Sequence, residues 1–171
     1  MVREPGGTEL AEEARRLVLH WHADVSPASE LFLYLVARAD LVARVIRPAR
    51  AAGKVVIADR FELSTRAYQC AGRGLPEAEV RAAIALAVGD VRPDLYVVLD
   101  LPVGIGRGRQ QAQGKQPDRL ERAEDAFHQR VAEAFRSAAG PEVVHVEAAG
   151  SAGAVHEAIW RVVQERFPRF A

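Results

Sequence analysis

The chain has 171 residues, 49% of them hydrophobic, and its 23 lysine and arginine residues balance its 23 aspartate and glutamate residues. That length supports one domain with a hydrophobic core and is too short for two domains of ordinary size. The balanced charge gives no extended basic surface, so we expect no nucleic acid partner and no membrane partner. The single Cys70 excludes an internal disulfide bond, and no apolar run could span a membrane. These features predict a cytoplasmic globular protein.

The chain opens with a short predicted strand and a helix. Residues 1–2 are expected to be extended, and Thr8 is expected to cap a helix after the Pro-Gly-Gly turn at 5–7. Apolar spacing predicts the buried face of this helix: Leu10, Ala14, Leu17, Val18 and Trp21. An isolated strand end at residue 1 suggests that the chain begins in the middle of its architecture.

A long second helix is predicted from Pro27 to about Ala52, with Gly53 at its end. Arg38 falls within its apolar face, one turn after Tyr34. The guanidinium either extends outward to solvent, which is the commoner outcome, or is held against a ligand or a carboxylate. In the second case a flat ring and a five-donor group would face the same way and could bind a nucleobase.

The strongest strand signal lies at residues 54–59. Four consecutive apolar residues, three of them β-branched, predict a strand that is covered on both faces in a parallel sheet. Ligands of open α/β sheets bind beyond the carboxyl ends of the strands, where Asp59 and Arg60 stand. A helix is expected next, from Ser64 to about Arg73.

The rest of the chain alternates between helices and strands. Further strands are predicted at 94–100 and 143–146. Further helices are predicted at 76–88 and 103–113, followed by one that begins after Glu121 and a final one that ends at Phe167. This order indicates an α/β fold with a parallel sheet and right-handed crossovers, in a single domain over residues 1–171.

Two other patterns allow more than one interpretation. The glycines at 104, 106 and 108 do not have the spacing of a dinucleotide-binding motif, which disfavours a dehydrogenase. Basic residues gather between 107 and 122, where a solvated helix face is the ordinary explanation. A mobile basic flap beside a phosphate site would instead suit a phosphoryl-transfer enzyme. His145 lies in a predicted strand and is interpreted as a packed residue.

A set of short motifs runs in order from residue 1 almost to the end of the chain. The motifs are Arg3-Glu4-Pro5-Gly6-Gly7-Thr8, Glu30 to Tyr34 with Arg38, Asp59-Arg60-Phe61, Ala67-Tyr68-Gln69 with Gly72-Arg73-Gly74, Arg92-Pro93-Asp94-Leu95, Leu99 to Pro102, and Asp118-Arg119-Leu120-Glu121. Together they resemble the bacterial thymidylate kinases, which make dTDP from dTMP. The resemblance implies a P-loop NTPase-type three-layer α/β fold, with a parallel sheet flanked by helices. It also implies ATP as co-substrate, Mg²⁺ as cofactor and a place in dTTP biosynthesis.

The resemblance implies roles for matching residues at the predicted strand end and on the second helix. Asp59 would sit near Mg²⁺ and act in catalysis together with Arg60, which would clamp the dTMP phosphate. Tyr34 would stack on thymine, and Arg38 would donate a hydrogen bond to one of its carbonyl oxygens.

Other matching residues would line the substrate or close over it. The loop over the sugar and phosphate would be formed by Arg3, Glu4 and Pro5. The base pocket would be lined by Ser64, Thr65 and Gln69, and Tyr68 would crowd the 2′ position of the sugar. A lid would span residues 107–119, in which Arg107 and Lys115 would act in catalysis and Arg107, Arg109 and Arg119 would bind ATP.

The sequence departs from the family pattern in two ways. The family begins with a strand, a G-x-x-x-x-G-K-[ST] phosphate loop and a helix, a unit on the order of 30 residues that is absent here. We therefore expect the chain as written to be truncated, to be inactive as a kinase, and to be poorly stable because strands 55–59 and 95–100 would face a gap. In the lid, a Gln-rich segment with Lys115 replaces the usual arginine.

Two alternative functions stay open. One is a non-catalytic relative that binds a nucleotide or a partner protein. The other is a related deoxynucleoside or nucleotide kinase whose pocket accepts a different base. A homodimer is also left open.

Overall fold

The computed structural model describes residues 1–102, 105 and 118–170, and these fall into two compact units. The first unit comprises Met1–Arg92 and Pro117–Phe135, and the second comprises Pro93–Gln116 and Arg136–Ala171. The helix predicted at 103–113 and most of the expected lid lie outside the described residues. No described helix is long and apolar enough to span a membrane.

The first unit is mainly helical. Its elements are β1 (Val2–Arg3), α1 (Glu9–His20), α2 (Pro27–Leu41), η1 (Val42–Ile46), α3 (Arg47–Ala51), β2 (Ala58–Asp59), α4 (Glu62–Thr65), η2 (Arg66–Gly72), α5 (Glu77–Val88) and α7 (Asp125–Arg136), whose last residue falls in the second unit. The long helix predicted from residue 27 is confirmed as the succession α2–η1–α3, in which η1 is a π-helical turn. The helix expected from Ser64 begins two residues earlier, as α4.

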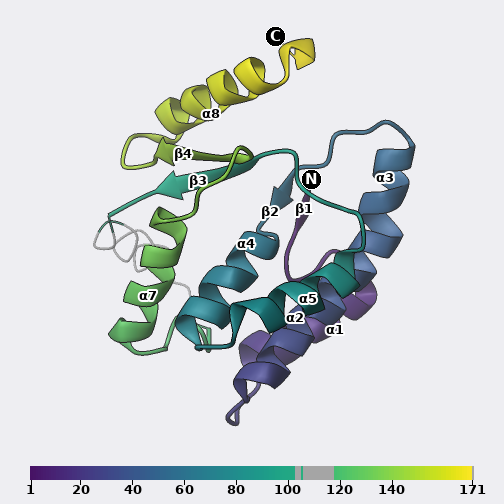
Figure 1. Cartoon of the computed structure of the whole chain (residues 1–171), viewed down its shortest axis with the longest axis vertical. Helices are drawn as coiled ribbons and strands as arrows, with labels where there is room; N and C mark the ends of the chain where they lie inside the picture. The colour runs from purple at the N-terminus through teal and green to yellow at the C-terminus, as the bar shows by residue number, and fades with distance from the viewer. Residues whose placement is uncertain (103–104, 106–117, 171) are drawn as a thin grey trace. The chain divides into compact units, whose positions relative to one another are not determined.

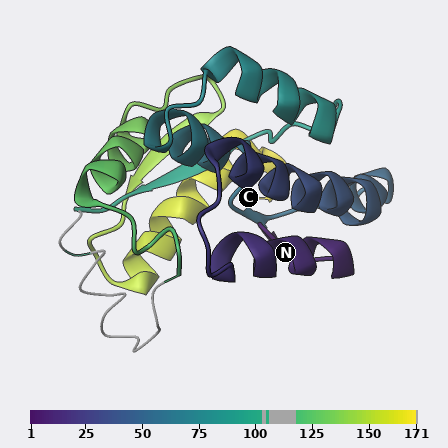
Figure 2. The ribbon, with the colours of Figure 1, turned by 90° about the horizontal axis from the view of Figure 1, so that it is seen from below.

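Helix α1 starts at its predicted capping residue, Thr8, and α2 is capped by Ser26. The Thr8 hydroxyl accepts a hydrogen bond from the Ala11 amide at 3.2 Å, and the Ser26 hydroxyl accepts one from the Ser29 amide at 3.1 Å. The two helices lie side by side (Figure 1), and Figure 2 shows the same pair from below. Buried alanines line part of this region, and small side chains allow two helix axes to approach closely. These alanines are Ala11, Ala14 and Ala37.

The predicted buried face of α1 is partly wrong. Leu10 is 51% exposed and Trp21 is also exposed, whereas Ala11, Ala14 and Val18 are buried. Both sets of residues follow helical spacing, so periodicity alone does not separate them. Helix α2 packs against the face of α1 that begins at Ala11, one residue after Leu10, and so buries that face.

Strand β2 is shorter and more exposed than the sequence predicts. It pairs in parallel with β1, in the register Val2 to Ala58 and Arg3 to Asp59. Val55 and Ile57 are 58% and 63% exposed, so the expectation of a strand covered on both faces is wrong. Among the described residues β2 pairs with β1 alone, in a sheet of two short strands.

The second unit is a small α/β layer. It contains β3 (Tyr96–Asp100), β4 (Val143–Glu147), α8 (Ala152–Arg166) and the 3₁₀ turn η3 (Pro168–Phe170). The strands pair in parallel from Tyr96–Val143 to Asp100–Glu147, as the α/β pattern predicts, and α8 packs against β4. Val98 and Val146 are buried, but His145 is exposed, so its interpretation as a packed residue is wrong.

Candidate functional site

The parallel pairing of β1 with β2 brings two predicted site segments together in the first unit. The Glu4 amide donates to the Asp59 carbonyl oxygen at 2.9 Å, so the residues that follow β1 lie beside those that follow β2. Arg60 comes next, with a φ of 69°, the only positive φ of a non-glycine residue in the described chain. Such a conformation is uncommon for an arginine and often marks a functional position.

Arg38 is held against a carboxylate inside the first unit. Its Nε and Nη2 donate to Glu4 Oε2 at 2.8 and 2.6 Å, and its guanidinium carbon lies 5.1 Å from the centre of the Phe61 ring. The residue is only 1% exposed, so the expectation that it extends outward is wrong. Burial raises the pKa of the Glu4 carboxyl, while the charge of Arg38 acts in the opposite direction. The third nitrogen, Nη1, is buried without a hydrogen-bond partner in the described structure.

Tyr34, Arg60 and Tyr68 form a second group. The guanidinium carbon of Arg60 lies 5.5 Å from the centre of the Tyr68 ring. The pKa of the Tyr34 hydroxyl is raised by burial and by the negative charge of Glu30. Tyr68 also packs edge-on against Phe135 at 6.1 Å between ring centres, which fixes one side of its ring in the core.

Thr65 and Gln69 stand one turn apart on α4 and η2, and both are buried. The Gln69 amide nitrogen donates to Glu30 Oε1 at 2.8 Å. Glu30, fully buried on α2, also accepts hydrogen bonds from Arg73 and Arg119. The sequence prediction gave Glu30 no role, although a Glu one turn before Tyr34 on an apolar helix face was a signal that could have found it.

The remaining predicted residues are less enclosed or lie elsewhere. Arg3 is exposed and pairs with Glu12 at 3.3 Å, while Pro5 is buried and its carbonyl oxygen accepts from Arg15. Ser64 is half-buried on α4. The structure therefore brings the predicted acceptor-site residues into one unit, at the ends of β1 and β2 and along α2, α4 and η2. Three predicted residues lie outside the described part of the chain: Arg107, Arg109 and Lys115.

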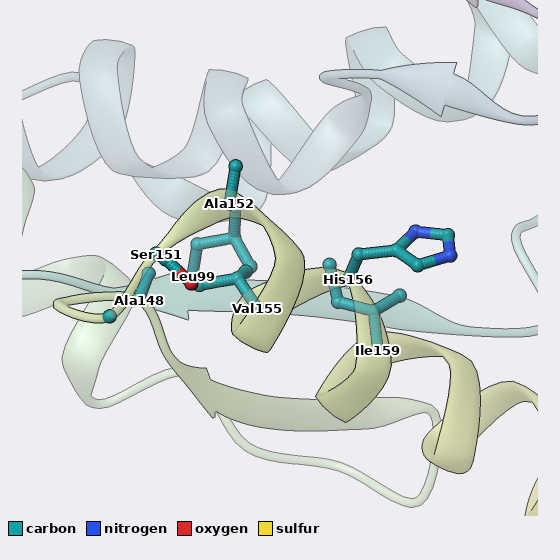
Figure 3. Close-up of a pocket in the computed structure, with 8 residues that line it drawn as sticks. Leu99, Ala148, Ser151, Ala152, Val155, His156 and Ile159 are labelled. Atoms are coloured by element: carbon teal, nitrogen blue, oxygen red, sulfur yellow. The ribbon is translucent and has the colours of Figure 1, made fainter.

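The second unit has a hollow of its own, of about 570 Å³. The residues labelled in Figure 3 come from β3, from the loop between β4 and α8, and from α8 itself. Its lining is mostly apolar and includes Leu99, Val155 and Ile159, with His156 and Ser151 as polar members. An apolar group would suit this lining better than a charged one.

No three His, Cys, Asp or Glu side chains gather as a metal site within the described residues. Asp59 is exposed at the end of β2 and presents a single carboxylate. A lone carboxylate suits Mg²⁺, which is commonly bound by one or two carboxylates together with substrate phosphates and water.

The chain is similar to one family of enzymes over nearly its whole length. A family model described as Thymidylate kinase matches residues 1–159. A thymidylate kinase of Synechococcus is 44% identical over 169 residues, which cover 97% of this chain and 80% of that protein. One of Pseudomonas fluorescens is 47% identical over 163 residues, covering 93% and 77%. One of Deinococcus radiodurans is 40% identical over 169 residues, covering 97% and 82%.

Proposed function

Because this chain belongs to the thymidylate kinase family, we propose that it transfers the γ-phosphoryl group of ATP to dTMP and releases dTDP. The family has the P-loop NTPase fold, and the parallel strand pairs β1–β2 and β3–β4 agree with an α/β fold of that kind. The first unit would hold dTMP.

The observation that carries this proposal is the partnerless Nη1 of Arg38. Glu4 fixes the guanidinium through its other two nitrogens, Nε and Nη2, and Nη1 is buried without an acceptor among the described residues. An unpaired buried donor costs about 1–3 kcal/mol, so an acceptor supplied by a ligand would recover that free energy. A thymine carbonyl oxygen is such an acceptor. Tyr34, one turn earlier on α2, would supply the ring that stacks on the base.

Arg60 would bind the phosphate of dTMP with its bidentate group of donors. Its positive φ sets the direction in which the side chain leaves β2, and its neighbour Tyr68 would pack against the sugar. The loop formed by Arg3, Glu4 and Pro5 would cover sugar and phosphate, while Ser64 and Thr65 would border the base. Phosphoryl transfer depends largely on such positioning and on charge neutralisation.

The donor side of the reaction involves Mg²⁺ and basic residues near the lid. Asp59 would hold Mg²⁺, which would neutralise charge on the phosphates when bound. Arg107, Arg109 and Arg119 would contact ATP, and Arg107 and Lys115 would support the transferred group. Asp59 and Arg60 are adjacent, so the metal ion and the dTMP phosphate would be held by one short segment.

Calorimetric titration with dTMP tests the proposal on the acceptor side. Arg60→Ala should weaken dTMP binding about a hundredfold, the size expected for a charged hydrogen-bonded pair. Arg50→Ala, in the last turn of α3 and exposed, is the matched control and should bind dTMP like the wild type. Unchanged affinity in Arg60→Ala would remove Arg60 from the site.

Product analysis tests the reaction itself. Formation of dTDP from dTMP and ATP, lost in Arg60→Ala, would support the proposed reaction and would show that the expected inactivity of the chain as written is wrong. Binding of dTMP without any dTDP would favour the alternative of a non-catalytic nucleotide-binding protein. Absence of dTMP binding to the wild-type chain would overturn the proposed function.

A further inference from the structure

Glu30 is a buried carboxylate with four hydrogen-bond donors around it. Its Oε1 accepts from Gln69 Nε2 at 2.8 Å and from Arg73 Nε at 3.2 Å. Its Oε2 accepts from Arg73 Nη2 at 3.0 Å and from Arg119 Nη2 at 2.6 Å. The side chain is 0% exposed. Arg73 and Arg119 already neutralise the charge of this carboxylate. The hydrogen bond from the neutral Gln69 is therefore not explained by charge pairing.

The ionised state of Glu30 decides how Gln69 can be oriented. Burial raises the pKa of this carboxyl, but the hydrogen bonds from Arg73, Gln69 and Arg119 outweigh it and hold the pKa below its ordinary value. An ionised carboxylate only accepts hydrogen bonds. The amide group of Gln69 must therefore turn its NH₂ toward Glu30, because the flipped amide would place two oxygens against each other. Its carbonyl oxygen is left on the other side.

This orientation gives the proposed base pocket a fixed polarity. Arg38 Nη1 offers a donor without a partner, and the carbonyl oxygen of Gln69 offers an acceptor. Thymine and uracil carry an acceptor at O4 and a donor at N3, whereas cytosine carries a donor at N4 and an acceptor at N3. A pocket with a fixed donor and a fixed acceptor is complementary to O4 and N3 of thymine or uracil, and it is not complementary to N4 and N3 of cytosine.

We propose that Glu30 is a positioning residue that locks the Gln69 amide and thereby sets the preference of the acceptor site for bases of the thymine and uracil type over cytosine. The inference rests on the proposed function, because it assumes that Gln69 faces the base. Glu30 itself does not touch the nucleotide; it acts through the side chain of Gln69.

The test compares the dissociation constants for dCMP and dTMP, measured by calorimetry. In Glu30→Gln the new amide can either donate or accept, so Gln69 is free to flip. The ratio of the dCMP constant to the dTMP constant should fall about tenfold, as expected for about 1.4 kcal/mol. Glu30→Asp keeps the charge for Arg73 and Arg119 but withdraws the carboxylate from Gln69, and it should lower the ratio as well. It therefore provides a second test if Glu30→Gln fails to fold.

The control is Arg73→Gln, which removes donors from Glu30 without releasing Gln69. It should lower stability and leave the ratio as in the wild type. A purely structural role for Glu30 would weaken both nucleotides by the same factor, and an unchanged ratio in either folded Glu30 variant would overturn the inference. If the wild-type chain binds neither nucleotide, it is the proposed function that fails. If the wild type prefers dTMP and the variants keep that preference, only the role of Glu30 fails.

Discussion

Arg38 and Glu4 lie 34 residues apart in the sequence and form a buried ion pair, with Nη2 and Oε2 separated by 2.6 Å. Glu4 reaches Arg38 because β1 pairs with β2, while Arg38 is placed by the last turn of α2. The pair therefore links the strand end to the helix that would carry the base. It also holds the guanidinium in the position that leaves Nη1 without a partner.

Removing the charge of Glu4 should destabilise the protein strongly. In Glu4→Gln the guanidinium of Arg38 stays buried without its counter-charge, which typically costs about 3–5 kcal/mol. Glu13→Gln breaks the exposed pair with Arg16 at 3.0 Å and should cost less than about 1 kcal/mol. Urea unfolding followed by circular dichroism measures both changes. Equal stabilities of the two variants would show that the buried pair contributes no more than a surface one.

Gly72 is predicted to be intolerant of any side chain. A Cβ atom at this position would lie 2.5 Å from Phe127 Cε2 and 3.0 Å from Val131 Cγ2, both on α7. Gly72→Ala should therefore destabilise the protein by about 1–3 kcal/mol through overpacking, despite the better helix propensity of alanine. Gly153 in α8 has no atom within 4 Å of the same position, so Gly153→Ala should be neutral or stabilising by up to about 1 kcal/mol. Thermal unfolding of both variants measures the difference in stability. Equal stabilities would show that α7 moves away from the added methyl group at position 72.

The sequence predicts the described helices and strands of this chain well where the signal is local. The cap at Thr8, the end of α5 at residue 88 and the strands β3 and β4 depend on neighbouring residues, and the structure confirms them. The burial of the segment that leads into β2 depends instead on what packs over its side chains in the folded chain. Val55 and Ile57 have the composition of a buried strand and are nevertheless exposed.

The same distinction between local signals and distant contacts limits how much of the candidate site can be predicted from the sequence. Motif order groups the residues of the predicted acceptor site, and these residues lie in one unit. The partners of these residues could not be predicted from spacing. Arg38 meets Glu4 across 34 residues, and Glu30 meets Arg119 across 89. Such contacts arise only once the helices and strands have packed, so a helical wheel shows the apolar face but not the buried carboxylate that an arginine on it will find.

Arg119 should anchor residues 118–120 to the helical core of the first unit. Its Nη2 donates to Glu30, its Nε donates to the Val18 carbonyl oxygen at 3.0 Å, and its backbone amide donates to the Leu19 carbonyl oxygen. Arg119→Lys replaces a planar group that makes two contacts by a point charge that cannot make both. We expect a loss of about 1–3 kcal/mol in the free energy of unfolding. Arg122→Lys changes an exposed residue three positions away and should have no measurable effect. If the two variants had the same free energy of unfolding, the contacts of Arg119 would make no measurable contribution to stability.

His145 joins three segments of the second unit in a way that requires a proton on each ring nitrogen. Nδ1 lies 2.9 Å from Asp100 Oδ2 on β3, and Nε2 lies 2.8 Å from the carbonyl oxygen of Ala138. Both partners accept hydrogen bonds, so only the charged imidazolium satisfies the two contacts at once. The Ala138 carbonyl and the Asp100 carboxylate accordingly raise the pKa of His145, and together they outweigh the opposing effect of burial.

Because this pKa is higher in the folded state than the value of about 6.5 in the unfolded chain, His145 binds its proton more tightly when the unit is folded. Its contribution to stability should be complete below about pH 6.5 and should be lost as the pH rises through the raised value. Titration of the His145 ring by NMR should give a midpoint above about 6.5. His145→Gln should flatten the fall in stability above that pH, whereas His156→Gln, on the exposed part of α8, should leave it in place. A midpoint at or below the unfolded value would mean that the two contacts are not made by the imidazolium.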